Sequence, residues 1–510
     1  MSFRQLIARF AKEPDSLTGK TLLLTAARFI SMAVNIVTPF VLVRILSEHE
    51  FGVYGIAFLV VTSVHELVGL NFGNAAAFFI PRKELNEDRV LATILGFNLT
   101  IGVFALIITV VFPEPMVWIA GSQDVKPLLP LIGATVFLWN ISRAMALVPI
   151  ALGKSAVSAS FIAVTESSKS LFVLIPALIW PGVESVLWGF LIWSALRSMV
   201  ALHYFHGRMK LRLNQFNFAT FKRMLTYAGP HALTGIVVII FNKYHQFLVT
   251  HFFDEATYAV YRNGVMQLPF ILVLLDSANS VLIPEVARRQ AAGSRDQIIE
   301  MTARVFVRLA TFFLPAIVLL EIFATEFITV LFTDTYLESV PIFRVNLLQL
   351  LCLLVIMDPI MRGYEELKLF RFKVFGALLV ILFVLGKPTV TQYGPIGATW
   401  LTLLALALGQ FISALKIRSL LDIGWRHLRL LSDMKYSICG CLGGAASSVA
   451  VRESMLRWAW FTESVEGILH PLVILIAGGL AFGVVCWLLF EGGPRFDRTR
   501  AMIGGLRGRS

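Results

Sequence analysis

Apolar runs of about 20 residues recur along the chain, separated by short polar segments, and a run of that length can span a bilayer as an α-helix. The strict alternation of apolar and polar residues that marks a membrane β-barrel strand is absent from the sequence. We therefore predict an all-α polytopic membrane protein with about 14 transmembrane helices. Their predicted ranges are 21–43, 52–75, 90–112, 127–150, 156–180, 184–205, 225–250, 257–283, 304–325, 340–361, 369–386, 394–415, 436–451 and 468–490.

A long basic loop divides the predicted helices into two groups. Paired halves with a binding site between them are a common transporter plan, so we expect two six-helix lobes around a central cavity, followed by two C-terminal helices. The predicted parts are an amphipathic cytoplasmic N-terminal segment (1–20), an N-lobe with helices 1–6 (21–206), a cytoplasmic inter-lobe loop (207–224), a C-lobe with helices 7–12 (225–415), two extra helices 13–14 (416–490) and a basic cytoplasmic tail (491–510).

The composition and the charge distribution agree with this assignment. The 510 residues are 57% hydrophobic and 15% charged, and the net charge is +12. A soluble basic protein would suggest nucleic-acid binding, but here the basic residues lie mainly in short loops. If both termini are cytoplasmic, the inner segments hold 31 Lys and Arg residues when Arg304, Arg371 and Lys373 at the cytoplasmic ends of two predicted helices are counted with them, and the outer loops hold 5. The positive-inside rule favours this orientation, so we predict no nucleic-acid partner.

Motifs for catalysis, nucleotide binding and metal binding are missing. The tripeptide "GKT" at 19–21 would need a glycine at position 14 to form a phosphate-binding loop, and Pro14 is there. The "CGC" at 439–441 has no second Cys or His pair to complete a zinc site. We therefore predict that the protein is not an enzyme and uses neither a metal nor a cofactor.

Charged residues inside the predicted helices are the main functional signal. A charge at the centre of a bilayer costs roughly 2.5–3.5 kcal/mol on insertion scales, so such residues should face protein, water or substrate. Cations outnumber acids at this depth, which favours an anionic ligand over a cationic drug. The predicted substrate-binding cations are Arg28, Arg143, Lys169, Arg197, Lys243 and Arg262, and the accompanying acids, which are candidates for ion coupling, are Glu66, Glu166 and Asp276.

The first predicted helix carries a polar stripe. Arg28, Ser31, Asn35 and Thr38 recur at steps of three and four residues, which places them on one face of a helix. We expect this face to line a water-filled cavity, and we count Asn35 among the substrate-binding residues. A purely structural alternative exists elsewhere, because Glu166 and Lys169 have the spacing of an i, i+3 ion pair. Arg197 could likewise be neutralised by Glu66.

Two segments resemble a known family. "SLTGKTLLLTAARFISMAVNIVTPFVLVRILSEHEFGVYGIAFLVV" (16–61) resembles the opening of the polysaccharide transporter (Wzx-type) flippases of the multidrug/oligosaccharidyl-lipid/polysaccharide exporter superfamily. "LTYAGPHALTGI" (225–236) is similar to the start of the family's second half. The resemblance implies alternating access that moves undecaprenyl-pyrophosphate-linked oligosaccharides across the bacterial cytoplasmic (inner) membrane, alongside a polysaccharide polymerase and glycosyltransferases. Resemblance to the related lipid II flippases implies that helices 13–14 form a groove for the polyprenyl tail.

Other functions stay open at this point. A cation-coupled small-molecule efflux antiporter of the same superfamily is the nearest alternative, but such exporters typically carry an acid in the first helix. This first helix has Arg28 and no acid. A scaffold subunit of a polysaccharide synthase would not need the deep cations. A membrane transferase would need clustered acids or metal ligands, and the short outer loops hold only scattered acids.

Overall fold

The computed structural model describes Phe29, Ser31 and residues 34–69, 72–209, 215–367, 369–424, 434–457 and 468–491. These residues form helices joined by short connections, and no strand occurs among them. Within the same residues, nine helices are long and apolar enough to cross a membrane. The predicted all-α polytopic membrane fold is confirmed. The predicted N-terminal segment and most of the basic tail lie outside the described residues, and the lobe boundaries stay predictions.

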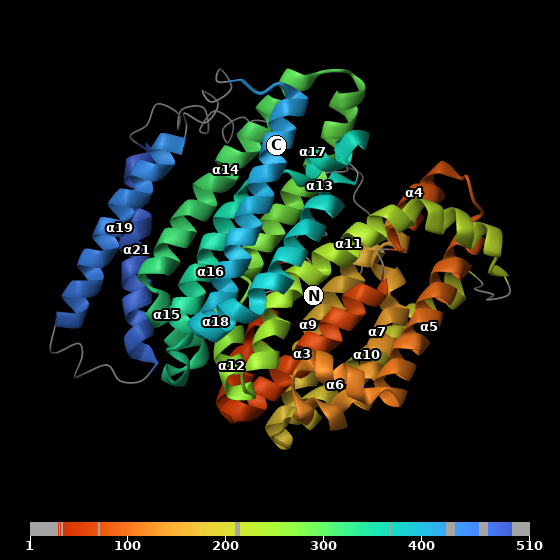
Figure 1. Cartoon of the computed structure of the whole chain (residues 1–510), viewed down its shortest axis with the longest axis horizontal. Helices are drawn as coiled ribbons and strands as arrows, with labels where there is room; N and C mark the ends of the chain where they lie inside the picture. The colour runs from red at the N-terminus through yellow and green to blue at the C-terminus, as the bar shows by residue number, and fades with distance from the viewer. Residues whose placement is uncertain are drawn as a thin grey trace, which may run out of the picture. The chain divides into compact units, whose positions relative to one another are not determined.

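The chain divides into two compact units (Figure 1). Unit 1 comprises Met1–Arg262, Gln267–Ser277 and Leu369–Leu401, and unit 2 comprises Asn263–Met266, Ala278–Lys368 and Thr402–Ser510. Two helices, α13 (Pro269–Ala291) and α18 (Phe370–Leu421), therefore contribute to both units. α18 contains two of the predicted spans, which meet at Gly394, where a φ of 67° breaks the helix.

Unit 1 holds most of the predicted charged residues. After a first described helix (Val34–Ile45), its elements are α3 (Glu48–Gly69), α4 (Asn74–Arg82), α5 (Glu87–Val111), α6 (Pro113–Ala120), η1 (Gln123–Leu128), α7 (Leu129–Ile141), η2 (Ser142–Ala146), α8 (Val148–Ala151), α9 (Ser155–Ile179), α10 (Val183–Met209), α11 (Phe218–Phe252) and α12 (Glu255–Gly264). α7 packs against α3, α5 and α10, and α9 packs against α10. These neighbours carry most of the deep charges.

Local sequence explains where several of these helices begin and break. Asn86 and Asn217 cap α5 and α11, because each side chain accepts hydrogen bonds from two backbone N–H groups of the first turn. The predicted span 127–150 is not one regular helix: it runs through η1, α7, η2 and α8, with Pro127, Pro130 and Pro149 in the sequence. A proline interrupts the hydrogen-bond ladder of an α-helix, which accounts for the irregular structure of this span.

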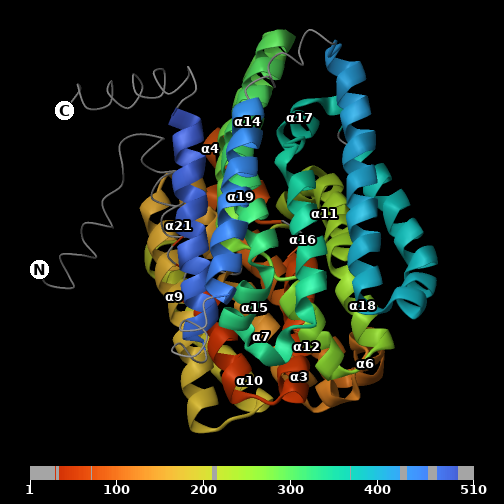
Figure 2. The ribbon, with the colours of Figure 1, turned by 90° about the vertical axis from the view of Figure 1, so that its left-hand side faces the viewer.

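Unit 2 is built around α14 (Arg295–Ile322), with α15 (Ala324–Phe332), η4 (Asp334–Tyr336), α16 (Ser339–Leu354), α17 (Asp358–Gly363), η5 (Glu365–Leu367), α19 (Met434–Arg457) and α21 (Leu469–Glu491). α19 and α21 lie side by side as a hairpin along α14 and α15 (Figure 2). The ion pair Glu326–Arg452, with 2.6 Å between Oε1 and Nε, fastens α19 to α15. These two helices correspond to the predicted helices 13 and 14.

Large apolar side chains are exposed along the helices of both units. Leu171, Ile175 and Leu178 on α9 are each more than half exposed, as are Phe312 on α14 and Leu480 on α21. A soluble protein rarely leaves so much apolar area in water, whereas a bilayer solvates it. The protein is therefore a multi-pass membrane protein whose helices present apolar faces to lipid.

Candidate functional site

Of the nine charged residues predicted for the site, seven lie on helices of unit 1 and are not exposed. α3 supplies Glu66, α9 supplies Glu166 and Lys169, and α10 supplies Arg197. The other three are Arg143 from η2, Lys243 from α11 and Arg262 from α12. All seven residues are partly or fully buried, and the Glu66 side chain is 43% exposed. We refer to these seven residues as the charged set.

Glu166 is the centre of the first group within the charged set. Its Oε2 lies 3.3 Å from Lys169 Nζ, and its Oε1 accepts a hydrogen bond from Arg197 NH1. The predicted pairing of Glu166 with Lys169 is therefore found, while Arg197 pairs with Glu166 and not with Glu66. One carboxylate thus serves two cations, which leaves this group with one unit of positive charge.

Arg197 is held from several sides. Only 7% of its side chain is exposed, and its Nε donates to Ser142 Oγ at 3.0 Å. Its guanidinium lies 5.1 Å from the ring centres of both Phe161 and Trp193. The aromatic faces offset part of the cost of desolvating a cation, so Arg197 is a fixed charge with little freedom to follow a ligand.

Lys243 and Glu66 form a looser pair between α11 and α3. Their Nζ and Oε1 atoms are 3.8 Å apart, beyond hydrogen-bond distance. The Lys243 side chain is 21% exposed and the Glu66 side chain 43% exposed. A pair with this geometry exchanges partners at low cost. Lys243 and Lys169 are therefore the most adaptable cations of the charged set.

Arg143 lies against the backbone of α3. Its NH1 donates to the carbonyl oxygen of His65 at 2.6 Å, and its guanidinium covers Gly69, the last residue of α3. His65 in turn stacks on Trp139, with ring centres 3.9 Å apart. The absence of a side chain at position 69 allows the guanidinium to approach this closely.

Replacing Gly69 by alanine should displace Arg143. The new methyl group would overlap the guanidinium, so the long side chain must move and give up its bond to His65. Loss of a hydrogen bond that involves a charge should lower the free energy of unfolding by roughly 1.5–3 kcal/mol, and thermal unfolding in detergent measures this loss. Gly229→Ala on α11 is the matched control, because its methyl group would meet open space. Equal stability of the two variants would contradict this contact.

Arg262 has a different environment. Its guanidinium lies 4.7 Å from the ring centre of Tyr54 and 5.4 Å from that of Phe51. Its NH1 is buried and has no hydrogen-bond partner within the part of the chain that the structure describes. A buried unsatisfied donor costs about 1–3 kcal/mol, and such groups in native proteins call for an explanation. The hydrogen-bonding capacity of Arg262 is therefore not fully used within the described residues.

The polar stripe of the first helix packs on α9. Thr38 Oγ1 donates to Ser170 Oγ at 2.8 Å, and that hydroxyl lies 3.3 Å from Asn35 Oδ1. Ser31 Oγ approaches the Ile162 carbonyl at 3.5 Å. Ser31 and Thr38 are buried, so the expectation that this face lines a cavity does not fit these two residues.

The two remaining predicted residues fall outside the charged set. Arg28 lies outside the described residues, so the structure does not place its side chain. Asp276 lies on α13 and is exposed.

The contacts that the spacing of residues in the sequence did not predict are those between different helices. Sequence spacing pairs residues within one helix, as for Glu166 and Lys169. Spacing gives no information on the ion pair of Arg197 with Glu166, on the hydrogen bond from Arg143 to a backbone carbonyl, or on the hydrogen bond between the polar stripe and Ser170. These contacts join different helices. The aromatic residues Trp139 and Trp193 also escaped notice, since apolar runs contain many aromatics. The substrate-binding and ion-coupling roles of the predicted residues stay predictions.

Comparisons with known proteins fit the helical architecture. Residues 41–341 match the family model described as "Polysaccharide biosynthesis protein". No curated protein sequence matches the chain. Among solved structures, "Lipid II flippase MurJ, inward closed conformation" is 17% identical, with a TM-score of 0.66 over 92% of this chain and 99% of that chain.

Two transporters of related architecture match as well. The MATE multidrug transporter DinF-BH is 16% identical, with a TM-score of 0.58 over 81% of this chain and 98% of its own. A MOP superfamily transporter from Pyrococcus furiosus, whose description reports a reversed polarity of the binding pocket, is 12% identical, with a TM-score of 0.55 over 82% and 98%. At these identities the likeness establishes the shared fold alone.

Proposed function

Because the chain belongs to the polysaccharide biosynthesis protein family, we propose that it is a flippase. It translocates polyprenyl-pyrophosphate-linked oligosaccharide repeat units across the bacterial cytoplasmic membrane by alternating access. The units serve the synthesis of O-antigen, capsule or exopolysaccharide, together with a polymerase and glycosyltransferases. The likeness to a lipid II flippase in fold supports the proposal.

The surplus of positive charge in the spans of unit 1 carries the proposal. Among the residues that the structure describes, Arg143, Lys169, Arg197, Lys243 and Arg262 are accompanied by the acids Glu66, Glu166 and Asp276, so two positive charges remain, and Arg28 of the predicted site adds a third. A pyrophosphate that is esterified at both ends carries two negative charges, which would neutralise most of this surplus. Buried cations are tolerated only when they are compensated, and an anionic substrate supplies that compensation during transport.

The members of the charged set have different roles in this proposal. Arg197 is a fixed positive charge held by Glu166. Lys169 and Lys243 contact the pyrophosphate, because both side chains are partly exposed, and Lys243 gives up its loose pair with Glu66 to do so. Arg262 supplies the guanidinium nitrogen that has no partner among the described residues, and a guanidinium matches phosphate oxygens in geometry.

A cation-coupled small-molecule efflux antiporter is the second candidate. The likeness in fold to a MATE multidrug transporter supports it. Glu66 is a partly exposed acid next to a cation and would be the first residue to test for proton or sodium coupling, followed by Glu166 and Asp276. An antiporter would confer resistance to cationic drugs, whereas a flippase would restore polymer export.

The experiment that tests the flippase is genetic complementation. Deletion of the gene should cause lipid-linked repeat units to accumulate on the inner leaflet, and the wild-type chain should rescue export. Arg28→Ala at equal membrane expression is expected to lower the rescue at least about tenfold, the factor that corresponds to loss of one charge-assisted contact. Full rescue by Arg28→Ala would remove Arg28 from the site, and no accumulation in the deletion strain would reject the flippase.

A further inference from the structure

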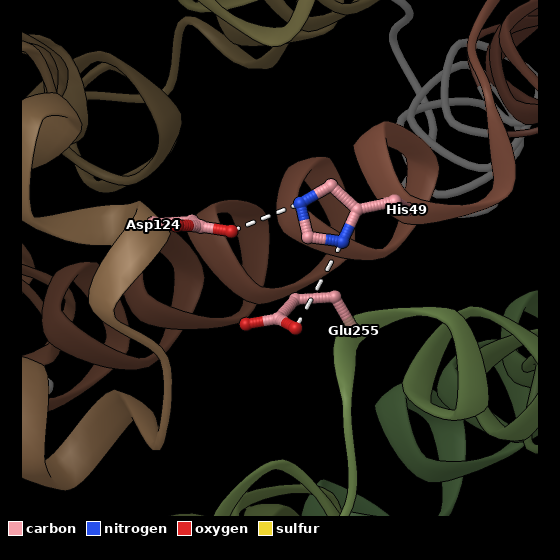
Figure 3. A group of neighbouring side chains, drawn as sticks. All are labelled: His49, Asp124 and Glu255. Carbon is pink, nitrogen blue, oxygen red and sulfur yellow. Dashed lines mark ion pairs between the residues drawn. The ribbon is translucent and has the colours of Figure 1, made fainter.

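Three metal-ligand side chains that are not members of the charged set meet in unit 1. Figure 3 shows the imidazole of His49 between the carboxylates of Asp124 and Glu255. His49 Nε2 lies 2.9 Å from Asp124 Oδ2, and His49 Nδ1 lies 3.9 Å from Glu255 Oε2. One ligand atom from each residue can be chosen so that all three lie within 4.8 Å of one another. We call these residues the His49 cluster.

The three residues come from separate segments of the chain. His49 lies in the first turn of α3, Asp124 lies in η1, and Glu255 is the first residue of α12. Glu255 is also oriented by Ser122, whose Oγ donates to Glu255 Oε1 at 2.5 Å. A convergence of three segments that are far apart in sequence needs the tertiary structure, unlike neighbouring acids on one exposed helix.

We propose that the His49 cluster binds one divalent transition-metal ion of the Zn²⁺ class. Zn²⁺ takes one histidine nitrogen at roughly 2.0–2.1 Å and carboxylate oxygens at roughly 2.0–2.2 Å, which places tetrahedral ligand atoms about 3.3 Å apart. The pair His49–Asp124 is already near this separation, and rotation of the Glu255 side chain brings its oxygen to the same ion. A water molecule completes the fourth position, since the His49 and Asp124 side chains are 58% and 51% exposed.

The electrostatic surroundings favour a cation. Two carboxylates with a neutral imidazole carry two negative charges, which one divalent ion neutralises. Asp254, whose Oδ1 accepts a hydrogen bond from the backbone N–H of Thr257 at 2.9 Å, adds a further carboxylate next to Glu255 in the chain. The basic residue of η1, Lys126, is already paired with Glu114 at 2.5 Å. Exposed ion pairs alone contribute little to stability.

The site has a consequence for transport, and this step rests on the proposed function. His49 and Asp124 belong to the predicted N-lobe, and Glu255 belongs to the predicted C-lobe. In the predicted orientation, all three lie on the outer side of the membrane. A bound ion would therefore tie α12 to α3 and η1, and Zn²⁺ should slow a transport cycle that separates these segments.

Zn²⁺ binding to the full-length protein, purified in detergent without a polyhistidine tag, tests the site directly. Competition with a colorimetric chelator should give one tightly bound Zn²⁺ per chain. His49→Ala or Asp124→Asn should weaken binding at least about tenfold, since even the loss of a residue that only orients a metal ligand weakens binding by about this factor. His251→Ala is the matched control, because it alters a histidine outside the cluster. Zn²⁺ should also raise the thermal midpoint of the wild type and not that of His49→Ala.

Equal Zn²⁺ affinity in the wild type and in His49→Ala would overturn the site, as would a wild type that binds no Zn²⁺ at all. Either result would leave ion pairs as the cluster's only role and would leave the flippase proposal untouched. Conversely, failure of the deletion strain to accumulate lipid-linked units would reject the proposed flippase function, and it would not affect the result of the Zn²⁺ titration. Slower export at added Zn²⁺, abolished by His49→Ala, would support the link between the two.

Discussion

Glu166→Gln is expected to destabilise the protein by roughly 3 kcal/mol, the cost of breaking a buried ion pair by removing one partner. The substitution keeps the side-chain volume and removes the charge that Lys169 and Arg197 share. Arg197 is the more affected cation, because only 7% of its side chain reaches solvent. The measurement is the midpoint of thermal unfolding in detergent, followed by fluorescence-detected size exclusion.

Two further variants distinguish this cost from a general effect of substitution in a membrane helix. Glu166→Gln combined with Arg197→Gln should recover much of the lost stability, because the uncompensated buried cation is then gone. Glu114→Gln is the matched surface control: its pair with Lys126 is exposed, with side-chain exposures of 66% and 45%, so its loss should cost about 0–1 kcal/mol. Additive losses in the double variant would show that Glu166 and Arg197 do not stabilise each other.

Lys243→Gln together with Arg262→Gln is expected to abolish export while the protein still inserts in the membrane. Each side chain would lose a charge-assisted contact with the pyrophosphate, worth about 1.5–3 kcal/mol, or roughly tenfold to hundredfold in binding. Replacing Lys243 should change the stability of the protein little, because its partner Glu66 is 43% exposed and is solvated after Lys243 is lost. The measurement is rescue of export in the deletion strain at matched membrane expression.

Charge, rather than shape, should determine this outcome. Lys243→Arg with Arg262→Lys keeps both positive charges and should retain much of the export. Lys387→Gln removes an exposed cation outside the charged set and should leave export at the wild-type level. Wild-type export by the Lys243→Gln/Arg262→Gln variant would remove both residues from the substrate path.

Helix positions were predictable because membrane insertion depends on local composition. Each predicted span within the described residues coincides with helical structure, since a run of apolar residues must satisfy its backbone hydrogen bonds within itself in lipid. Breaks inside spans were harder to predict. The predicted span 257–283 is divided into α12 and α13, and 340–361 into α16 and α17, because hydropathy records how apolar a segment is and not where its helix stops.

The sequence by itself determined the membrane class, the helical architecture and the excess of deep cations, because these depend on composition and on residues close together in the chain. The i, i+3 pair of Glu166 and Lys169 belongs to the same group. Only the tertiary structure decided which polar side chains already have partners: Arg197 pairs with Glu166, Arg143 lies on α3 at Gly69, and Thr38 donates a hydrogen bond to Ser170. Contacts between helices depend on how the helices rotate and pack, and a one-dimensional pattern does not contain that information.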